Sequence, residues 1–375
     1  MKRIAFTGDL GFSSKYFRGT CEKEDLLHPE LVEYLADTDY TVVNVEGCVF
    51  QGQGSANKPI VHANPPECVG FLKKINGNIW NIANNHIMDC GREGLESTLR
   101  IAEENGIPIV GVGLNEEQAA RPVIIENDGA DIGILSVTQE ETPEATENTE
   151  GVVQWDNLEK LGQMIAGVKA KCRWCVVVVH AGPEFCQMMP PSVRELYRGY
   201  LELGADVVIG HHPHVVQNYE VFGEKIIFYS LGNFVFDTDY QRLQRYTDQG
   251  IFVKLAFDKD SFTWDHRAMK IDRQTQTILP CPTPDIFADV PEKQYRLLWP
   301  LAMHDLYENE RVKFGYLFPK MKGISKKKWA AFYRERGKKY PRWQCIARGD
   351  RLYRLGLWRL GDKKVRSYIT DGMRK

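Results

Sequence analysis

The sequence ADVVIGHHPH, at residues 205–214, joins an apolar run to a cluster of three histidines. The run at 207–209 is β-branched, which favours a buried strand. Because side chains alternate along a strand with a period of two, a His-x-His pair at its end presents both imidazoles on one side. Neutral imidazole is a common ligand for transition metals. We therefore expect a strand that ends at a metal site, with His212 and His214 as ligands and His211 as a bystander.

Short apolar runs alternate with helix-like segments over most of the first 270 residues. Runs typical of strands lie at 4–7, 41–45, 79–83, 108–112, 132–137, 176–179, 207–209, 215–221, 225–229 and 251–257. Helix-like segments lie at 29–36, 66–75, 94–105, 158–170 and 192–203. This alternation predicts a layered α/β domain. From 215 to 257 the strand-like runs follow one another without helices, so we expect an antiparallel set there, and either a mixed sheet or two packed sheets.

The composition is that of a folded protein without membrane spans. The chain has 375 residues, of which 43% are hydrophobic, enough for a full core. No stretch reaches the roughly 18–20 apolar residues that cross a bilayer. The N-terminus runs directly into a strand without an apolar leader segment, so we expect no signal peptide. The nine cysteines form no short-period framework, which favours a reduced, cytoplasmic setting.

Charge is distributed unevenly along the chain. The formal net charge is −2, yet residues 311–375 hold 21 Lys and Arg against 4 Asp and Glu. The proline-rich segment 280–284 precedes this change in composition, so we expect one domain at 1–280 and a basic, aromatic, mainly helical region at 281–375. Residues 138–151, which are rich in Glu and Thr, are expected to form an exposed acidic loop.

The basic region has three interpretations. It can be a small helical cap that packs on the acidic body. It can attach the protein peripherally to an anionic membrane surface, an anionic polymer or a polymer synthase complex, and its Trp and Arg residues at 351–360 favour such an interface. Contact with nucleic acid is the least favoured of the three.

Four further predicted strands also end in polar residues. These residues are Asp9, Glu46, Asn85 with His86 and then Asp89, and His180 followed by Glu184. In open α/β sheets, ligands collect beyond the carboxyl ends of the strands. Carboxylate, amide and imidazole donors together suit Zn, Mn or Fe. The sequence thus predicts a site for divalent metal ions at this edge of the sheet.

Each of these strand ends also has a plainer interpretation. Asp9 after Gly8 can belong to a turn, and His180 can be a buried histidine that only packs. The segment 84–86 can be a helix N-cap, because Asn caps helices well. Pro213 can make the histidines on either side of it turn residues. The ordered occurrence of such residues at five strand ends favours the metal site.

Five motifs carry a family resemblance. They are Asn44-Val45-Glu46, Asn85-His86-Ile87-Met88-Asp89-Cys90-Gly91, His180-Ala181-Gly182-Pro183-Glu184-Phe185, Gly210-His211-His212-Pro213-His214-Val215-Val216-Gln217 and Tyr229-Ser230-Leu231-Gly232-Asn233-Phe234. Over residues 1–258 they resemble the capsule-synthesis protein CapA family, also called the poly-gamma-glutamate synthesis protein family, of the calcineurin-like metallophosphoesterase superfamily. The resemblance implies a four-layer α/β/β/α sandwich of metallophosphoesterase type, followed by a small helical basic C-terminal extension.

The resemblance also implies a role for each site residue. In that scheme Asp9 and His214 bind a first metal, Glu46 bridges two metals, Asn85, His180 and His212 bind the second, His86 is the catalytic imidazole, and Asp89 and Glu184 orient histidines. The wider superfamily opens with Asp-x-His, whereas this chain continues from Asp9 with Leu10-Gly11. The first site therefore lacks one ligand. We expect one or two metal ions, with a tight second site and a weak or empty first site.

Three functions are compatible with these residues. The first is a metal-dependent phosphoric ester hydrolase that acts on a phosphate ester or an anionic polymer. It would serve the biosynthesis of a capsule or another extracellular polymer, of polysaccharide or poly-gamma-glutamate type, and the presence of His86 favours it. The second is a catalytically weak, metal-binding accessory protein of a polymer synthase, which the missing first-site histidine favours. The third is a general cytosolic phosphodiesterase, which the motifs of the capsule branch disfavour.

Overall fold

The computed structural model describes residues 1–52, 60–139, 141–299 and 302 of the chain. The chain divides into two compact units, Met1–Asp289 and Val290–Lys375. The basic region from 311 onward lies outside the described residues, so its helices and its partners stay predictions. The same holds for the predicted boundary at 280, although the last strand of the first unit ends at that residue.

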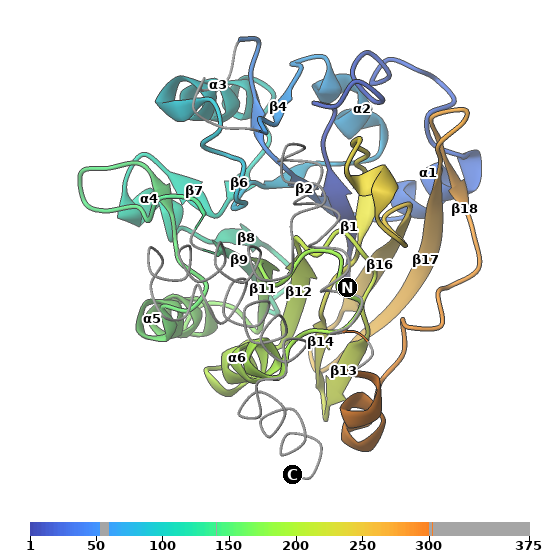
Figure 1. Cartoon of the computed structure of the whole chain (residues 1–375). Helices are drawn as coiled ribbons and strands as arrows, with labels where there is room; N and C mark the ends of the chain where they lie inside the picture. The colour runs from blue at the N-terminus through green and yellow to red at the C-terminus, as the bar shows by residue number, and fades with distance from the viewer. Residues whose placement is uncertain (53–59, 140, 300–301, 303–375) are drawn as a thin grey trace, which may run out of the picture. The chain divides into compact units, whose positions relative to one another are not determined.

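The first unit contains two large sheets (Figure 1). In the first, the strand order is β18-β17-β16-β1-β2-β5-β6, and β15 also pairs with β1. Its strands are β1 (Lys2–Leu10), β2 (Tyr40–Val45), β5 (Ile79–Asn81), β6 (Ile109–Val110), β15 (Asn233–Val235), β16 (Gln249–Phe257), β17 (Phe262–Asp272) and β18 (Thr277–Pro280). Strands β1, β2, β5 and β6 are parallel, whereas β16, β17 and β18 add antiparallel strands on the other side of β1. The sheet is therefore mixed.

The second large sheet has the order β13-β14-β12-β11-β9-β8. Its strands are β8 (Val123–Ile125), β9 (Ile132–Thr138), β11 (Trp174–His180), β12 (Val207–His211), β13 (Tyr219–Phe222) and β14 (Lys225–Phe228). The four central strands are parallel, and the two edge strands are antiparallel to their neighbours. Two short pairs complete the strands: β3 (Cys48–Val49) with β4 (Ala63–Asn64), and β7 (Val112–Gly113) with β10 (Gly151–Val152).

The helices follow the parallel strands, as expected for α/β connections. They are α1 (Pro29–Ala36), α2 (Cys68–Lys74), α3 (Gly91–Glu104), α4 (Glu116–Ala119), α5 (Leu158–Lys169) and α6 (Pro191–Glu202), with a 3₁₀ turn at Gln241–Leu243. Asn157 caps α5, since its side chain accepts a hydrogen bond from the Lys160 N–H. Each of the five predicted helices has its counterpart within three residues at either end.

Alternation along the strands sorts the side chains into layers. In β11, Val177 and Val179 join the core beneath α5 and α6, whereas Val176 and Val178 join the core between the two sheets. The first sheet is packed in the same way against α1, α2 and α3 on its outer face. The order helix, sheet, sheet, helix is the predicted four-layer α/β/β/α sandwich, and this prediction is confirmed.

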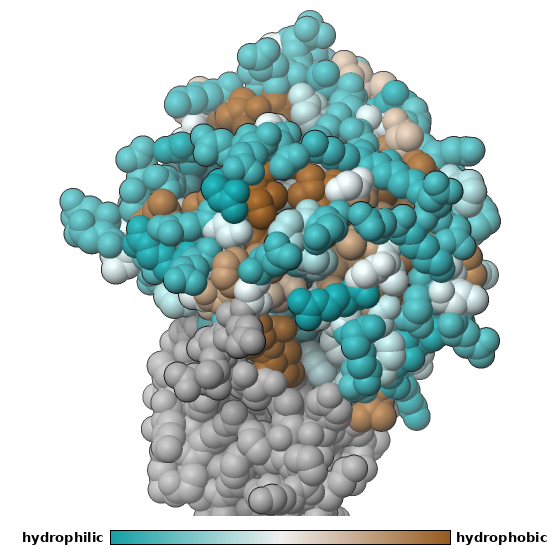
Figure 2. Space-filling view, turned by 90° about the horizontal axis from the view of Figure 1, so that it is seen from above, coloured by the Kyte–Doolittle hydropathy of each residue, from teal (hydrophilic) through white to brown (hydrophobic). Residues whose placement is uncertain are grey.

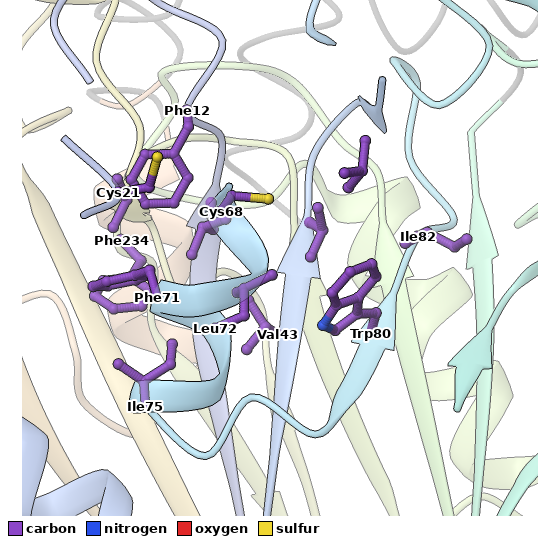
Figure 3. Close-up of a cluster of buried hydrophobic side chains, with 14 of the residues drawn as sticks. Phe12, Cys21, Val43, Cys68, Phe71, Leu72, Ile75, Trp80, Ile82 and Phe234 are labelled. Atoms are coloured by element: carbon purple, nitrogen blue, oxygen red, sulfur yellow. The ribbon is translucent and has the colours of Figure 1, made fainter. Parts of the chain in front are cut away.

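Aromatic residues fill the core between α2 and the first sheet (Figure 3). Phe71 of α2 lies with its ring centre 5.3 Å from Phe12 and 5.9 Å from Phe234. Trp80 of β5 is fully buried in the same core. Each such side chain stabilises the fold by about 1.5–3 kcal/mol through burial. This packing holds the carboxyl end of β1 in place, because Phe12 follows that strand directly.

The predicted antiparallel set at 215–257 is correct only in part. Strand β13 begins at Tyr219, and residues 215–218 form a buried loop instead of a strand. Strand β14 pairs antiparallel with β13 but parallel with β12. The sheet also continues beyond the predicted end, because β17 and β18 follow β16.

The predicted acidic loop at 138–151 is exposed only in part, which corrects the prediction. Its residues Glu144 and Glu147 are exposed, but Gln139 and Thr142 are buried. The Thr142 hydroxyl donates to the carbonyl oxygen of Asn84 at 2.8 Å. The start of the loop thus packs on the segment that follows β5 and belongs to the site.

Among the described residues, no helix combines the length and apolar character that a membrane crossing requires. Figure 2 shows one face of the molecule, on which hydrophilic residues cover most of the described surface. Apolar residues show on this face only in limited areas between them.

Candidate metal centre

The carboxyl ends of the parallel strands bring the predicted site residues together. In the first sheet, Asp9 of β1 lies in register with Asn44 of β2 and Asn233 of β15. In the second sheet, His180 of β11 lies in register with His211 of β12. The backbone N–H of His212 donates to Oδ2 of Asp9 at 3.3 Å. The ends of the two sheets therefore meet at one site.

Asp9 is fully buried and surrounded by hydrogen-bond donors. The Asn44 side chain donates to its Oδ1 at 2.7 Å, and Nδ1 of His211 lies 3.2 Å from the same oxygen. Nδ1 of His214 lies 3.2 Å from Oδ2. Burial alone raises the pKa of Asp9, but the contacts with His211 and His214 outweigh it, so the pKa lies well below its ordinary value. Asp9 is thus ionised at neutral pH, the form that binds a cation.

Glu46 lies directly after β2 and is also fully buried. Neither of its carboxylate oxygens has a hydrogen-bond partner among the described residues. Burial, reinforced by the negative charges of Asp9, Glu184 and Asp89, raises its pKa well above the ordinary value. A buried carboxylate without partners is costly unless a cation pairs with it. Glu46 therefore fits a metal ion.

His214 completes a group of three possible ligands with Asp9 and Glu46. One ligand atom from each of the three lies within 4.8 Å of the other two. Nε2 of His214 is 3.6 Å from Oε1 of Glu46, and its Nδ1 is 2.9 Å from Oδ1 of Asn233. Burial lowers the pKa of His214, but the charges of Glu46 and Asp9 raise it to about 9. These three residues are the first-metal set that the sequence predicts.

A second group lies beside the first and contains the other predicted ligands. Nε2 of His180 is 2.9 Å from Oδ1 of Asn85 and 3.2 Å from Nδ1 of His212. Burial, with His212 nearby, lowers the pKa of His180 well below its ordinary value, so it is neutral, as a ligand must be. One carboxylate oxygen of Glu184 lies within 4.8 Å of ring nitrogens of His212 and His214, so Glu184 could share a metal ion with them, where the resemblance implies a residue that orients histidines.

His86 lies at the rim of the two groups. Its Nδ1 is 2.7 Å from Oδ2 of Asp89, and its Nε2 is 3.9 Å from Oε1 of Glu46. Its side chain is 15% exposed, whereas those of Glu46 and Asp89 are fully buried. His86 is thus the imidazole of this cluster that combines contact with Glu46 and access to solvent.

The backbone is strained at three residues of the site. Phe185, His212 and His214 have φ angles of 58°, 91° and 56°, in the left-handed region that non-glycine residues rarely adopt. Such conformations cost of the order of 1–3 kcal/mol each and cluster at functional sites. The Phe185 N–H donates to the carbonyl oxygen of Pro213 at 2.7 Å, which ties two of these strained segments together.

Residues 3–238 match the model of a protein family described as bacterial capsule synthesis protein PGA_cap. The chain belongs to this family. All of the predicted site residues, from Asp9 to His214, lie within the part that matches PGA_cap.

Two proteins from Bacillus are similar to this chain in sequence. The PGA biosynthesis protein CapA of Bacillus subtilis (strain 168) is 33% identical over 245 residues, which cover 64% of this chain and 64% of that protein. The capsule biosynthesis protein CapA of Bacillus anthracis is 30% identical over 227 residues, which cover 58% of this chain and 55% of that protein. The match spans less than two thirds of the length of each relative. A solved structure, the 5'-nucleotidase from Candida albicans SC5314, is similar with a TM-score of 0.41 and 9% identity, over 82% of this chain and 58% of that one.

His211, which the sequence predicts to be a bystander, is buried in this PGA_cap site with its Nδ1 3.2 Å from Oδ1 of Asp9. That it binds no metal stays a prediction. Because β12 includes His211, the His211 side chain lies on the same face of the strand as that of Ile209, which packs between the two sheets. His212 and His214 lie beyond the strand, where alternation no longer applies. Their place at the site comes from the turn around Pro213.

The PGA_cap site also contains residues to which the sequence analysis assigns no role. They are Asn44, which contacts both Asp9 and His180, Gln139, which lies 2.8 Å from Nε2 of His212, Asn233 beside His214, and His62 beside His86. Gln139 directly follows β9, so the rule that points to the other strand ends also points to it. His62 precedes the two-residue strand β4, and nothing in its sequence context marks it.

Proposed function

We propose that this protein is a metal-dependent, phosphoesterase-like member of the PGA_cap family that takes part in the biosynthesis of a capsule or another extracellular polymer. The observation that carries the proposal is the buried Glu46 carboxylate, which lies between Asp9, His214 and His86 and has no hydrogen-bond partner in the part of the chain that the structure describes. A buried carboxyl group among ligand side chains, which a cation would hold in its charged form, is what a divalent metal site requires. One or two ions of Mn, Zn or Fe suit these donors.

The chain offers two sets of ligands. Asp9, Glu46 and His214 would hold one ion, and Asn85, His180 and His212, with Glu46 as the bridge, would hold the other. When bound, divalent cations act as Lewis acids on a phosphoryl oxygen and stabilise the charge that develops there.

His86 supplies the acid–base group of the proposed reaction. Its Nδ1 is fixed by Asp89 at 2.7 Å, which leaves Nε2 on the side of Glu46 and of the solvent. From this position Nε2 can donate a proton to the leaving oxygen of a phosphate ester. Asp89 orients the ring and stabilises its protonated form, a role that its burial favours.

The biological role is proposed from the relatives. Two of them are named for the biosynthesis of PGA and of capsule. We infer a phosphate ester or an anionic polymer, of polysaccharide or poly-gamma-glutamate type, as the substrate. The cysteines among the described residues are free thiols, which supports a reducing, cytoplasmic location. Attachment to an anionic membrane or a polymer synthase through the basic region is part of the same proposal.

A catalytically weak accessory protein is the second candidate, and one observation favours it. A side chain at Gly11, where the superfamily places its first-site histidine, would begin 2.9 Å from the Phe236 ring. Phe236 also stacks on His214 with ring centres 4.8 Å apart. The place of the missing ligand is thus filled by an apolar ring, which leaves the first metal with three protein ligands.

Metal analysis combined with hydrolysis of a chromogenic phosphodiester tests the proposal. The variants are Glu46→Gln, which removes the buried charge, and His86→Ala, which removes the proton donor. We expect wild type to bind divalent metal and hydrolyse the diester. E46Q should lose metal, whereas H86A should keep metal and lose activity by about 10²–10⁴-fold. Full metal content with no activity in any of the three proteins would establish the accessory role instead.

A further inference from the structure

His62 lies beside the candidate metal centre without belonging to either ligand group. Its backbone N–H donates to Oδ2 of Asp89 at 2.8 Å, and its carbonyl oxygen accepts from the Cys48 N–H at 3.2 Å. The backbone of His62 is therefore fixed next to the residue that orients His86. Its side chain is 3% exposed, so it points into the molecule.

The two ring nitrogens of His62 differ in their surroundings. Nδ1 lies 2.6 Å from the Ser13 hydroxyl oxygen. Nε2 is buried and has no hydrogen-bond partner within the part of the chain that the structure describes. A buried polar atom left without a partner costs about 1–3 kcal/mol. Such an atom beside a reactive cluster indicates a ligand that is present during function.

The position of the ring shows where this ligand would lie. The ring of His62 is perpendicular to that of His86, with centres 4.3 Å apart, and it lies 5.0 Å from the ring of Phe236. Phe236 in turn stacks on His214. The rings of these four residues form a continuous wall, and Glu46 contacts its two ends at His86 and His214.

A role as metal ligand is less consistent with these contacts. His62 is not among the described residues whose ligand atoms come together with those of Asp9, Glu46 and His214. Burial, with His86 and His214 nearby, lowers the pKa of His62 well below its ordinary value, so the ring is neutral. A neutral imidazole that accepts a hydrogen bond at Nδ1 carries its proton on Nε2 and donates from there.

We propose that His62 is a substrate-binding residue, whose Nε2–H donates a hydrogen bond to a phosphate oxygen beside His86. In this proposal the Ser13 hydroxyl, 2.6 Å away, donates to Nδ1 and so places the ring proton on Nε2. This inference rests on the proposed function, because it assumes that a phosphate group enters the site. His62, directly before β4, would thus add a phosphate contact to the site residues that follow the ends of the long strands.

Binding of inorganic phosphate to the metal-loaded protein tests the inference independently of turnover. His62→Phe keeps a ring of similar size without nitrogen, and His62→Gln keeps an N–H donor. Ser13→Ala leaves the ring in place but frees its tautomer. His266→Phe is the matched control, because His266 lies on β17, away from the carboxyl ends of the parallel strands. Calorimetry gives the Kd for phosphate, and elemental analysis gives the metal content.

We expect H62F to weaken phosphate binding about tenfold at unchanged metal content, the loss of one hydrogen bond to a charged group. H62Q should restore most of the binding, S13A should weaken it by a smaller factor, and H266F should match wild type. Unchanged phosphate affinity in both H62F and S13A would overturn the inference. Loss of metal in H62F would also overturn it, and so would a wild-type protein that holds metal but binds no phosphate. Phosphate binding that depends on His62, in a protein that hydrolyses no ester, would contradict the proposed function and leave the inference standing.

Discussion

Nδ1 of His86 lies 2.7 Å from Oδ2 of Asp89, and this contact sets the direction of the ring. The same carboxylate oxygen accepts the backbone N–H of His62 at 2.8 Å. Asp89 is fully buried, so both hydrogen bonds form away from water, where they are stronger. One carboxylate therefore holds the imidazole of His86 and the backbone of His62.

Asp89→Asn should lower kcat about 10–100-fold while the metal content stays at the wild-type value. The amide keeps the size of the side chain but loses the charge that orients His86 and stabilises its protonated form. Steady-state kinetics and elemental analysis on the same samples check this. Loss of activity in proportion to loss of metal would instead assign Asp89 to the metal site.

Glu46→Gln should stabilise the metal-free protein and abolish its stabilisation by metal. Burial raises the pKa of Glu46, so ionising this carboxyl group without metal is costly, and it has no hydrogen-bond partner among the described residues. A neutral amide of the same size removes that cost, at a gain of about 1–3 kcal/mol. Wild type with Mn²⁺ at 100 times its Kd should gain about 2.7 kcal/mol over protein in EDTA. Thermal melting of both proteins in EDTA and in Mn²⁺ measures the effects. An E46Q protein that is less stable in EDTA, yet still stabilised by Mn²⁺, would show that Glu46 holds no metal.

Gly11→His should lower the melting temperature without adding metal. A Cβ at residue 11 would lie 2.9 Å from the Phe236 ring, and overpacking of this kind costs about 1–3 kcal/mol. The double variant G11H/F236A makes room for the imidazole, so it should recover stability relative to F236A and bind more metal per chain. Metal titration followed by elemental analysis distinguishes the variants. Extra metal in G11H alone would mean that Phe236 does not block this position.

Asp37→Asn should destabilise the fold at neutral pH. Nζ of Lys254, which is 7% exposed, lies 3.1 Å from Oδ2 of Asp37, and the substitution leaves this buried ammonium group without its carboxylate. The hydrogen bond from Lys254 lowers the pKa of Asp37, so the stabilisation is present at neutral pH and is lost as the pH falls through that lowered pKa. Urea unfolding at several pH values should show the difference between wild type and D37N shrinking in acid. In a Lys254→Met background D37N should have little effect, and an equal effect there would rule out the pairing.

Much of the fold follows from local sequence pattern. The β-branched runs at 176–179 and 207–209 become the buried parallel strands β11 and β12, because such runs are buried on both faces. The sequence analysis does not predict strand β17, because several of its residues are charged and it contains no continuous apolar run. Its strand structure comes from long antiparallel pairing with β16, which no local pattern reveals.

The candidate site is predictable where its residues directly follow long strands. Asp9, Glu46 and His180 were identified in this way, and Gln139 could have been. The contact of His211 with Asp9 is harder to predict, because the strand ends at this residue, and the turn that follows determines where the later histidines lie. His62 could not be found, because its place beside His86 depends on the pairing of β3 with β4 and not on any pattern around it.

Anomalous diffraction from crystals grown with Mn²⁺ tests the central claim most directly. We expect a manganese peak within bonding distance of Asp9, Glu46 and His214, and a second peak, if two ions bind, beside Asn85, His180 and His212. A fully ordered site with no anomalous peak at Glu46 in saturating Mn²⁺, or with peaks only at surface carboxylates, would contradict it.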